Sequence, residues 1–340
     1  MVKIMRIISC ASYYGSGSSA ITDLLSEYDN IFSFTDEEFR FVQDPDGISD
    51  LEYNLVQNFN RHNSGRAIKR YKRLVDFYAG NIFSHKYEKY FHGEWKKKSY
   101  QYINKLTDFT YKGSWMYDYL DRGVTFYYLT HLPTKLLRAT LWRKQPERFL
   151  NMLPNEVTYC SHPSEEKFLN ATRKYIDSLF GSVSKGFDNV VIDQIVPSTN
   201  LKRYIRYFNN INVVIVDRDP RDIYCLEKYV WKDGMIPTDV ETFCKWFRYT
   251  RANRNKELEN PRVKFVRFED LIYKYEETVE DVEKWLNLSV KDHIRAKKCF
   301  VPAQSINNTQ VWEKYDCDKN EIKYIEKNLS KYLYDFPSTL

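Results

Sequence analysis

The chain opens on an apolar run that gives way to small polar residues and then to a second apolar pattern. Apolar positions dominate residues 4–10, small and hydroxyl-bearing residues follow, and the apolar positions of 20–25 recur as on one face of a helix. This succession predicts a strand, a loop and a helix. Glycines and hydroxyls before a helix start let backbone N–H groups gather around an anion, where the helix dipole favours negative charge. We therefore expect a phosphate or sulfate group to bind at Gly15, Ser16, Gly17, Ser18 and Ser19, although a tight turn before a core helix explains the same pattern.

Four later segments have the pattern of strands in a parallel sheet. The second and third lack alternation, as expected when both faces of a strand are buried. The four segments are Asn30–Phe34, Asn189–Asp193, Asn212–Asp217 and Val263–Arg267. Residues from about 45 to 180 are mostly helical in pattern. The sequence thus predicts one α/β domain over residues 1–340, with three layers, a central parallel sheet, a P-loop-like anion site and a large, mostly helical insertion at about 45–180.

Bulk composition is that of a folded globular protein. Hydrophobic residues make up 43% and aromatic residues 16% of the 340 positions, with neither a membrane-spanning apolar run nor an N-terminal targeting pattern. We therefore expect a cytoplasmic protein without a transmembrane segment. The six cysteines stand singly, with no histidine at zinc-ligand spacing, so we expect free thiols and no metal. The net charge of +6 is mild and no nucleic-acid-binding module is present, so nucleic acid is not an expected partner.

A second segment with candidate chemistry follows the buried run that ends at Asp217. It reads Arg218-Asp219-Pro220-Arg221-Asp222. An arginine at the carboxyl end of a parallel strand faces the ligand crevice, and its planar fork suits phosphate. An Arg/Asp salt-bridge cluster at the start of the next helix is the alternative. The opening loop lacks the lysine of the G-x-x-x-x-G-K-[ST] pattern, which disfavours ordinary nucleoside-triphosphate hydrolysis.

With Gly15–Ser19 and Arg218–Asp222 in this order, the chain resembles the sulfotransferases that use 3′-phosphoadenosine-5′-phosphosulfate. In that family a loop after the first strand binds the 5′-phosphosulfate, and an Arg-x-x-[RK]-[DA] segment after a later strand binds the 3′-phosphate. Arg267–Leu271 resembles the family's R-[YF]-E-D-L segment, and Ser305–Lys314 resembles its late S-x-x-N…W-[KE] loop near the nucleotide.

The resemblance covers about residues 4–40 and 188–335. It implies that 3′-phosphoadenosine-5′-phosphosulfate is the cofactor. The residues it implies for cofactor binding are Gly15, Ser16, Gly17, Ser18, Ser19, Arg218, Trp312 and Lys314.

Two positions depart from the family pattern. Gly15 stands where the family's loop normally has Lys or Arg, so stabilisation of the bridging oxygen must come from elsewhere, with Arg40 or a lysine of the middle region as candidates. Leu226 stands where a serine usually helps to bind the 3′-phosphate, and Cys225 and Lys228 are the candidates to compensate.

Sulfuryl transfer needs a base for the acceptor's proton and fixed dipoles or positive charge for the leaving phosphate. Two residues compete for the base. Glu38, in Glu37-Glu38-Phe39-Arg40, resembles the Glu-Glu-x-Arg segment of the tyrosyl-protein sulfotransferases, whose second Glu is the base. His131, in a Thr-His-Leu-Pro stretch, resembles the catalytic histidine of the cytosolic small-molecule sulfotransferases. We rank Glu38 first, and either side chain has a structural role as its alternative.

The expected function is transfer of a sulfuryl group to a hydroxyl of a carbohydrate: a polysaccharide, an oligosaccharide or a glycolipid. Basic and aromatic residues interleave in the middle region, a combination that pairs with carboxylates and stacks on sugar rings, although a solvated helix face explains it equally well. A steroid or other small alcohol is the alternative acceptor. A P-loop-type small-molecule kinase and a non-catalytic nucleotide- or glycan-binding relative are the alternative functions.

Overall fold

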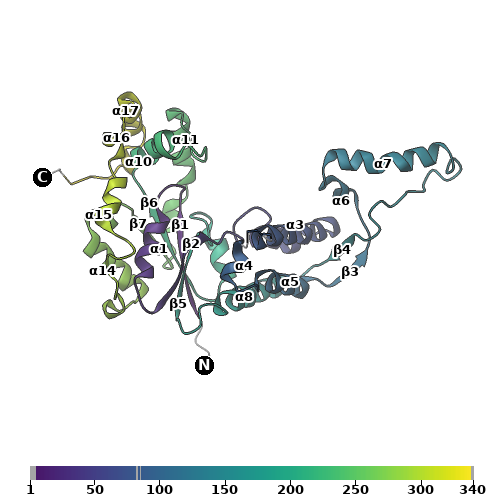
Figure 1. The fold of residues 1–340 in the computed structure, drawn as a ribbon, viewed down its shortest axis with the longest axis horizontal. Coiled ribbons are helices and arrows are strands. Elements are labelled where there is room, and N and C mark those ends of the chain that lie inside the picture. The colour runs from purple at the N-terminus through teal and green to yellow at the C-terminus, as the bar shows by residue number, and fades with distance from the viewer. Residues whose placement is uncertain (1–4, 82, 85, 338–340) are drawn as a thin grey trace. The chain divides into compact units, whose positions relative to one another are not determined.

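The computed structural model describes residues 5–81, 83–84 and 86–337 (Figure 1). Ile4, the first residue of the expected opening run, lies outside these ranges. The chain divides into two compact units, the first formed by residues 1–44 and 176–340 and the second by residues 45–175. The second unit begins and ends close to the bounds expected for the helical insertion. That the chain is one domain carrying an insertion stays a prediction.

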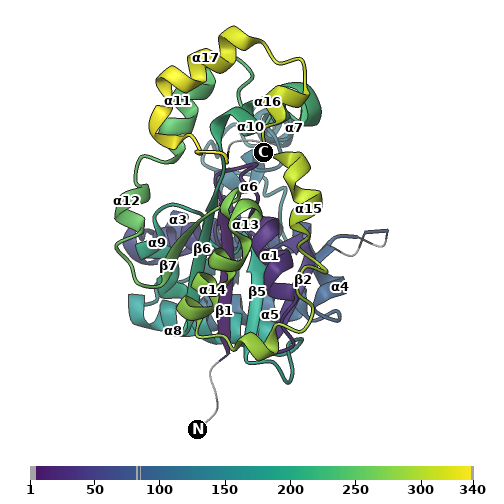
Figure 2. The ribbon, with the colours of Figure 1, turned by 90° about the vertical axis from the view of Figure 1, so that its left-hand side faces the viewer.

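The first unit is built on a parallel sheet of five strands in the order β2-β5-β1-β6-β7 (Figure 2). The strands are β1 (Arg6–Ser12), β2 (Ile31–Glu38), β5 (Asn189–Asp193), β6 (Ile211–Asp217) and β7 (Val263–Arg267). All four pairings are parallel, and helices flank the sheet, so the predicted α/β class is confirmed. The predicted second strand is longer than expected, because β2 resumes pairing with β5 at Glu38 after an irregularity that follows Ser33.

One face of the sheet is covered by α1 (Ser18–Ser26), α13 (Asp270–Tyr273) and α14 (Tyr275–Leu286). Their apolar side chains share a buried cluster with residues of all five strands. Leu24 and Leu25 of α1 are fully buried there, which is the apolar helix face expected from the sequence. Phe180, near the end of α8 (Glu165–Gly181), packs edge-on against Phe34 and Phe39.

The remaining elements of the first unit are short, and most of them follow the carboxyl ends of strands. They are α9 (Leu201–Tyr204), a 3-10 turn (Ile205–Tyr207), α10 (Pro220–Cys225), a π-helix (Leu226–Trp231), α11 (Val240–Thr250), α12 (Arg254–Glu257), 3-10 turns (Val290–Asp292, Ile306–Asn308, Ser330–Tyr332), α15 (Pro302–Ser305), α16 (Val311–Lys314) and α17 (Lys319–Asn328). A second apolar cluster joins α10, α11, α16 and α17.

The second unit is mostly helical, as its pattern predicts. Its helices are α2 (Ile48–Glu52), a π-helix (Tyr53–Gln57), α3 (Arg61–Ala79), α4 (Lys86–Tyr90), α5 (Trp95–Leu106), α6 (Met116–Leu120) and α7 (Val124–Ala139). An antiparallel pair of strands, β3 (Phe109–Lys112) and β4 (Val157–Cys160), was not expected from the sequence. Among the described residues, no helix of either unit combines the length and apolar character needed to cross a membrane.

Candidate active site

The loop between β1 and α1 has the backbone of an anion-binding turn. Gly15 (φ 64°) and Gly17 (φ 92°) lie in the left-handed region, which glycine adopts without a steric penalty. The backbone N–H of Tyr13 donates to Ser16 Oγ at 3.0 Å, and this hydroxyl donates to the carbonyl of Val216 at 2.6 Å, which ties the loop to β6. Gly17 brings no side chain to cap α1. The first-turn N–H groups, including those of Ser18 and Ser19, therefore point to a ligand or to water.

Gly15 is covered by an aromatic ring. A Cβ atom at this position would lie 2.7 Å from Cζ3 of Trp231, the last residue of the π-helix that continues α10. The indole therefore occupies the space into which a side chain at position 15 would grow. This contact and the left-handed backbone of Gly15 both disfavour a lysine at position 15. No local pattern predicts this contact, because Trp231 is distant from Gly15 in sequence and comes close to it only in the folded chain.

The ring of Phe268 packs against Gly17 and also contacts the guanidinium of Arg218. A Cβ atom at Gly17 would lie 2.8 Å from Cδ2 of the Phe268 ring. The guanidinium carbon of Arg218 lies 4.7 Å from the centroid of the same ring, within the range of a cation–π contact. Gly17, Phe268 and Arg218 thus form a column, which we call the Phe268 column. It brings together the loop and the arginine that the sequence predicted as two separate anion sites.

Arg218 has the properties of an anion-binding arginine. It is 4% exposed, and burial lowers its pKa against the opposing effect of Asp222 and Glu269. Its Nη2 donates to the carbonyl of Asn308, whereas its Nε–H has no hydrogen-bond partner among the described residues. A buried guanidinium with an unused donor is costly unless an anion or ordered water completes it.

The strand end that presents Arg218 is braced by buried ion pairs. Asp217 accepts from Nη2 of Arg251 at 2.6 Å, and both side chains are fully buried. Arg254 Nη1 adds a further contact to this carboxylate at 3.1 Å. Although burial opposes ionisation, Arg251 holds the pKa of Asp217 below its usual value. The carboxylate also accepts the backbone N–H of Arg218 at 2.9 Å, so these pairs fix the direction in which the arginine leaves the sheet.

Arg221 takes the structural role that the sequence left open for this segment. Its guanidinium pairs with Asp219 at 2.9 Å and with Glu326 at 3.0 Å. It also lies 4.0 Å from the centroid of the Trp312 ring. Asp219 is the N-cap of α10 and accepts the backbone N–H of Arg221. Of the two interpretations of this segment, the Arg/Asp salt-bridge cluster at the helix start therefore applies to Arg221 and not to Arg218.

Lys314 stabilises the turn at residues 306–309, which contacts Arg218. Its Nζ donates to the carbonyls of Ile306, Asn307 and Thr309 at 3.1, 3.0 and 2.8 Å. The same turn offers the carbonyl of Asn308 to Arg218. Two predicted cofactor-binding residues, Trp312 and Lys314, therefore lie on the segment that contacts Arg218 through Asn308. Their visible contacts are with the protein itself.

The end of β5 contributes two residues that sequence reasoning missed. Asp193 Oδ2 accepts from Ser18 Oγ at 3.2 Å, and Oδ1 has no hydrogen-bond partner within the described ranges. Gln194 donates from Nε2 to Ser12 Oγ at 2.6 Å and to Ser18 Oγ at 3.0 Å. Burial raises the pKa of Asp193 to about 7, and the nearby charge of Glu38 adds to this effect. The sequence pattern that could have indicated Asp193 is an apolar run that ends in Asp, as also occurs at Asp217.

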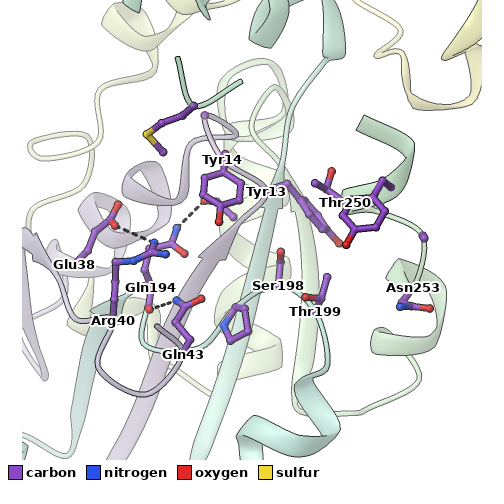
Figure 3. Close-up of a pocket in the computed structure, with 16 residues that line it drawn as sticks. Tyr13, Tyr14, Glu38, Arg40, Gln43, Gln194, Ser198, Thr199, Thr250 and Asn253 are labelled. Atoms are coloured by element: carbon purple, nitrogen blue, oxygen red, sulfur yellow. Dashed lines mark hydrogen bonds and ion pairs between the residues drawn. The ribbon is translucent and has the colours of Figure 1, made fainter. Parts of the chain in front are cut away.

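Beside the loop lies a cavity of about 390 Å³ built from the first unit (Figure 3). Glu38, Arg40 and Gln43 lie on one side of it, and Thr250 and Asn253 on the other. Its lining is Ser12, Tyr13, Tyr14, Gly15, Glu38, Arg40, Gln43, Gln194, Pro197, Ser198, Thr199, Met235, Tyr249, Thr250, Ala252 and Asn253. Neutral hydrogen-bonding groups and tyrosine rings thus surround a single acid–base pair.

That pair is made by Glu38 and Arg40. Arg40 Nη1 lies 3.5 Å from Glu38 Oε2, and Arg40 Nε lies 2.9 Å from Asp44 Oδ1. The Glu38 side chain is 51% exposed, so its carboxylate is accessible from the cavity. The structure therefore brings Glu38, Arg40 and the loop residue Gly15 to one cavity.

His131 lies in the second unit, within helix α7. Its Nδ1 donates to the carbonyl of Tyr127 at 2.7 Å. The ring of Tyr127 lies 4.2 Å from the imidazole, and Tyr119 and Phe149 also contact it. The Thr-His-Leu-Pro stretch is thus part of a helix, and Pro133 lies inside it.

The basic side chains of α3 are largely paired within the second unit. Arg66 lies 2.9 Å from Asp121, and Lys69 lies 2.8 Å from Glu156. Arg70 pairs with Asp46 at 2.7 Å. These contacts favour the interpretation of this basic cluster as an ion-paired helix face.

A scan against protein-family models finds no match, and no curated protein matches the chain. Solved structures do resemble it. A sulfotransferase domain from the curacin biosynthetic pathway is 16% identical, with a TM-score of 0.42 over 98% of this chain and 100% of that chain. A sulfotransferase domain from the Synechococcus PCC 7002 olefin synthase is 11% identical, with a TM-score of 0.41 over 98% and 95%. Retinol dehydratase, solved with androsterone and the inactive cofactor PAP, is 13% identical, with a TM-score of 0.36 over 99% and 84%.

Proposed function

We propose that this chain is a sulfotransferase that uses 3′-phosphoadenosine-5′-phosphosulfate. The observation that carries the proposal is the Phe268 column, which joins an uncapped helix start at Gly17 to a buried arginine with an unused donor. Both lie at the carboxyl ends of parallel strands, where α/β sheets bind ligands. Two anion sites on one crevice suit a nucleotide with phosphate at both its 3′ and 5′ positions. In this proposal Arg218 binds the 3′-phosphate and the start of α1 binds the 5′-phosphosulfate.

The residues around the cavity fit the proton transfer and charge stabilisation that this reaction needs. When bound, the cofactor supplies the sulfuryl group. Glu38, accessible in the cavity, accepts the proton of the acceptor hydroxyl. The N–H groups at the start of α1 stabilise the charge that develops on the leaving phosphate. Arg40 orients Glu38 and supplies the positive charge that the loop lacks at Gly15.

We propose a carbohydrate hydroxyl as the acceptor. The exposed aromatic side chains of Tyr14 and Tyr249 line the cavity, and Ser198 and Asn253 offer neutral hydrogen-bonding groups. Aromatic faces that stack on sugar rings, together with groups that bind hydroxyls, suit a saccharide. Since the cavity's charged side chains are a mutual pair, its lining favours a neutral sugar unit at the point of transfer. A steroid or other small alcohol is the alternative acceptor.

Calorimetry tests the cofactor. We expect 3′-phosphoadenosine-5′-phosphate to bind and Arg218→Ala to weaken it, while ATP with Mg²⁺ binds poorly because the loop lacks a lysine. Transfer of labelled sulfate to a panel of neutral oligosaccharides and small alcohols then identifies the acceptor class. Failure of the bisphosphate to bind overturns the proposal. Tight binding of ATP with Mg²⁺ favours a kinase, and bisphosphate binding without transfer to any acceptor favours a non-catalytic relative.

The base is tested by matched substitutions. Glu38→Gln should lower kcat by about 100-fold or more and leave bisphosphate affinity unchanged, because it removes only the proton acceptor. Glu37→Gln makes the same chemical change one residue earlier and is the control. If Glu38→Gln keeps full turnover while His131→Ala abolishes it in a folded protein, His131 is the base.

A further inference from the structure

Helix α7 has an unusual distribution of polar and apolar residues. Its two buried polar residues, Thr130 and Thr134, are 8% and 2% exposed. Three of its four leucines face outward instead, with Leu129, Leu132 and Leu136 exposed by 59%, 48% and 66%. A helix in contact with water on its outer side normally shows the opposite arrangement.

The polar side of α7 is used by the chain itself. Thr134 Oγ1 accepts the backbone N–H of Leu150 at 3.2 Å. Arg138 Nε donates to the carbonyl of Arg148 at 2.9 Å. These bonds attach residues 148–150 to the side of α7 that carries Thr134 and Arg138. The side of the helix that carries Leu129, Leu132 and Leu136 is left exposed. The outward apolar face is therefore a consequence of specific contacts.

Further exposed apolar side chains lie along the helix and just beyond its end. Val124 and Tyr128 lie toward the start of α7, and Leu141 lies past the last turn, with exposures of 63%, 61% and 82%. Apolar patches of this kind on a folded protein mark a surface that binds a partner. We call the outward residues of 124–141 the α7 face.

The charge of this segment favours an anionic partner. Residues 124–146 contain Lys135, Arg138, Arg143 and Lys144 and no acidic residue. An isologous contact with a second copy would bring the same basic surface against itself. Anionic lipid headgroups provide the complementary charge, and the aromatic Tyr128 beside the leucines is of a type enriched at membrane interfaces. A 16-residue amphipathic helix that is basic and apolar lies in the interface plane.

We propose that the α7 face docks this protein on an anionic membrane surface. The leucines enter the boundary between headgroups and acyl chains, and the lysines and arginines contact the headgroups. This inference is independent of the proposed sulfotransferase activity, because its residues and its readout do not involve the cavity.

Vesicle co-sedimentation of the full chain tests the inference. We expect binding to phosphatidylcholine vesicles that contain a third phosphatidylglycerol, weaker binding to pure phosphatidylcholine, and loss of most binding when salt rises from about 0.1 M to about 0.5 M. The triple variant Leu129→Asn, Leu132→Asn, Leu136→Asn should bind at least about tenfold more weakly. Because these side chains are exposed, circular dichroism should show an intact fold.

Two further variants make the result specific. Ile294→Asn removes an apolar side chain that is 61% exposed in the first unit, and its vesicle binding should equal that of the unmodified chain. Lys135→Glu with Lys144→Glu should abolish the preference for anionic vesicles. The proposal is overturned if the chain does not bind anionic vesicles or if the leucine variant binds as well as Ile294→Asn. It is also overturned if the chain dimerises through these leucines in sedimentation velocity, because the face would then be an interface between copies.

Discussion

The Phe268 column predicts that Gly17 cannot carry even one methyl group. In Gly17→Ala the new Cβ would lie 2.8 Å from Cδ2 of Phe268, and the backbone would have to keep a φ of 92°. Phe268 is only 5% exposed and supports the guanidinium of Arg218, so the ring has little room to swing aside. Both the loop and the arginine should therefore be disturbed.

Two costs add in this variant. Left-handed backbone costs a residue with a Cβ about 1–2 kcal/mol, and forcing a group into a packed site costs about 1–3 kcal/mol. The free energy of unfolding should fall by about 2–5 kcal/mol in total. Gly186→Ala is a matched control, because Gly186 has a φ of 91° and no atom within 4 Å of an added Cβ. It should show the backbone cost alone.

Urea denaturation measures both variants, and calorimetry with 3′-phosphoadenosine-5′-phosphate measures the effect on Arg218. We expect the urea midpoint of Gly17→Ala to lie clearly below that of Gly186→Ala at a similar m-value. In the background of Phe268→Leu, which removes the ring, Gly17→Ala should cost less than it does alone. Equal destabilisation by Gly17→Ala and Gly186→Ala would refute the reasoning, because the contact with Phe268 would then have no energetic effect.

Three further predictions concern the charged groups of the site. Arg218→Ala should weaken binding of 3′-phosphoadenosine-5′-phosphate by about 1.5–3 kcal/mol, measured by calorimetry, and an unchanged affinity would remove Arg218 from the site. Burial raises the pKa of Asp193 to about 7 in the folded chain, whereas an unfolded aspartate titrates near about 3.9. The unfolded state therefore binds fewer protons between these values, and stability should fall as pH rises from about 4 to about 7. Asp193→Asn should remove part of that slope in urea titrations, and an unaltered slope would contradict the assignment. Arg251→Ala leaves the buried carboxylate of Asp217 without its main partner and should cost about 3–5 kcal/mol in the same titrations, whereas a cost below about 1 kcal/mol would show that Arg254 suffices.

Strands β5 and β6 were predictable because both of their faces are largely buried. Asn189–Asp193 appears in the structure with the predicted bounds, since an uninterrupted apolar run between polar ends has few other solutions. Val263–Arg267 also has its predicted bounds, although Lys264 interrupts its apolar positions. The strands β3 and β4 were missed because each has only four residues, none of them buried, and because they pair across a long stretch of sequence. Local pattern carries no information about such a pairing.

The candidate site was partly predictable for the same reason. Gly17 lies in the loop that follows β1 and Arg218 directly follows β6, so their place at the carboxyl edge of the sheet followed from the order of elements. Trp231 was not predictable, because its contact with Gly15 depends on the π-helix that turns the chain back over the loop. Asp193 stood at a strand end like the others, and its role depends on Ser18 and Glu38 arriving beside it.

The place of β5 in the sheet bears on how the protein is made. β5 lies between β1 and β2 in the strand order, yet it follows both of them in sequence, after the whole of the second unit. During synthesis β1 and β2 are therefore made well before β5, the strand that lies between them in the folded sheet. During that interval their unpaired edges are exposed to aggregation, and chaperone binding would protect them. A chain truncated before β5 would also lack Asp193 and Gln194, and the loop between β1 and α1 would lose their hydrogen bonds to Ser18.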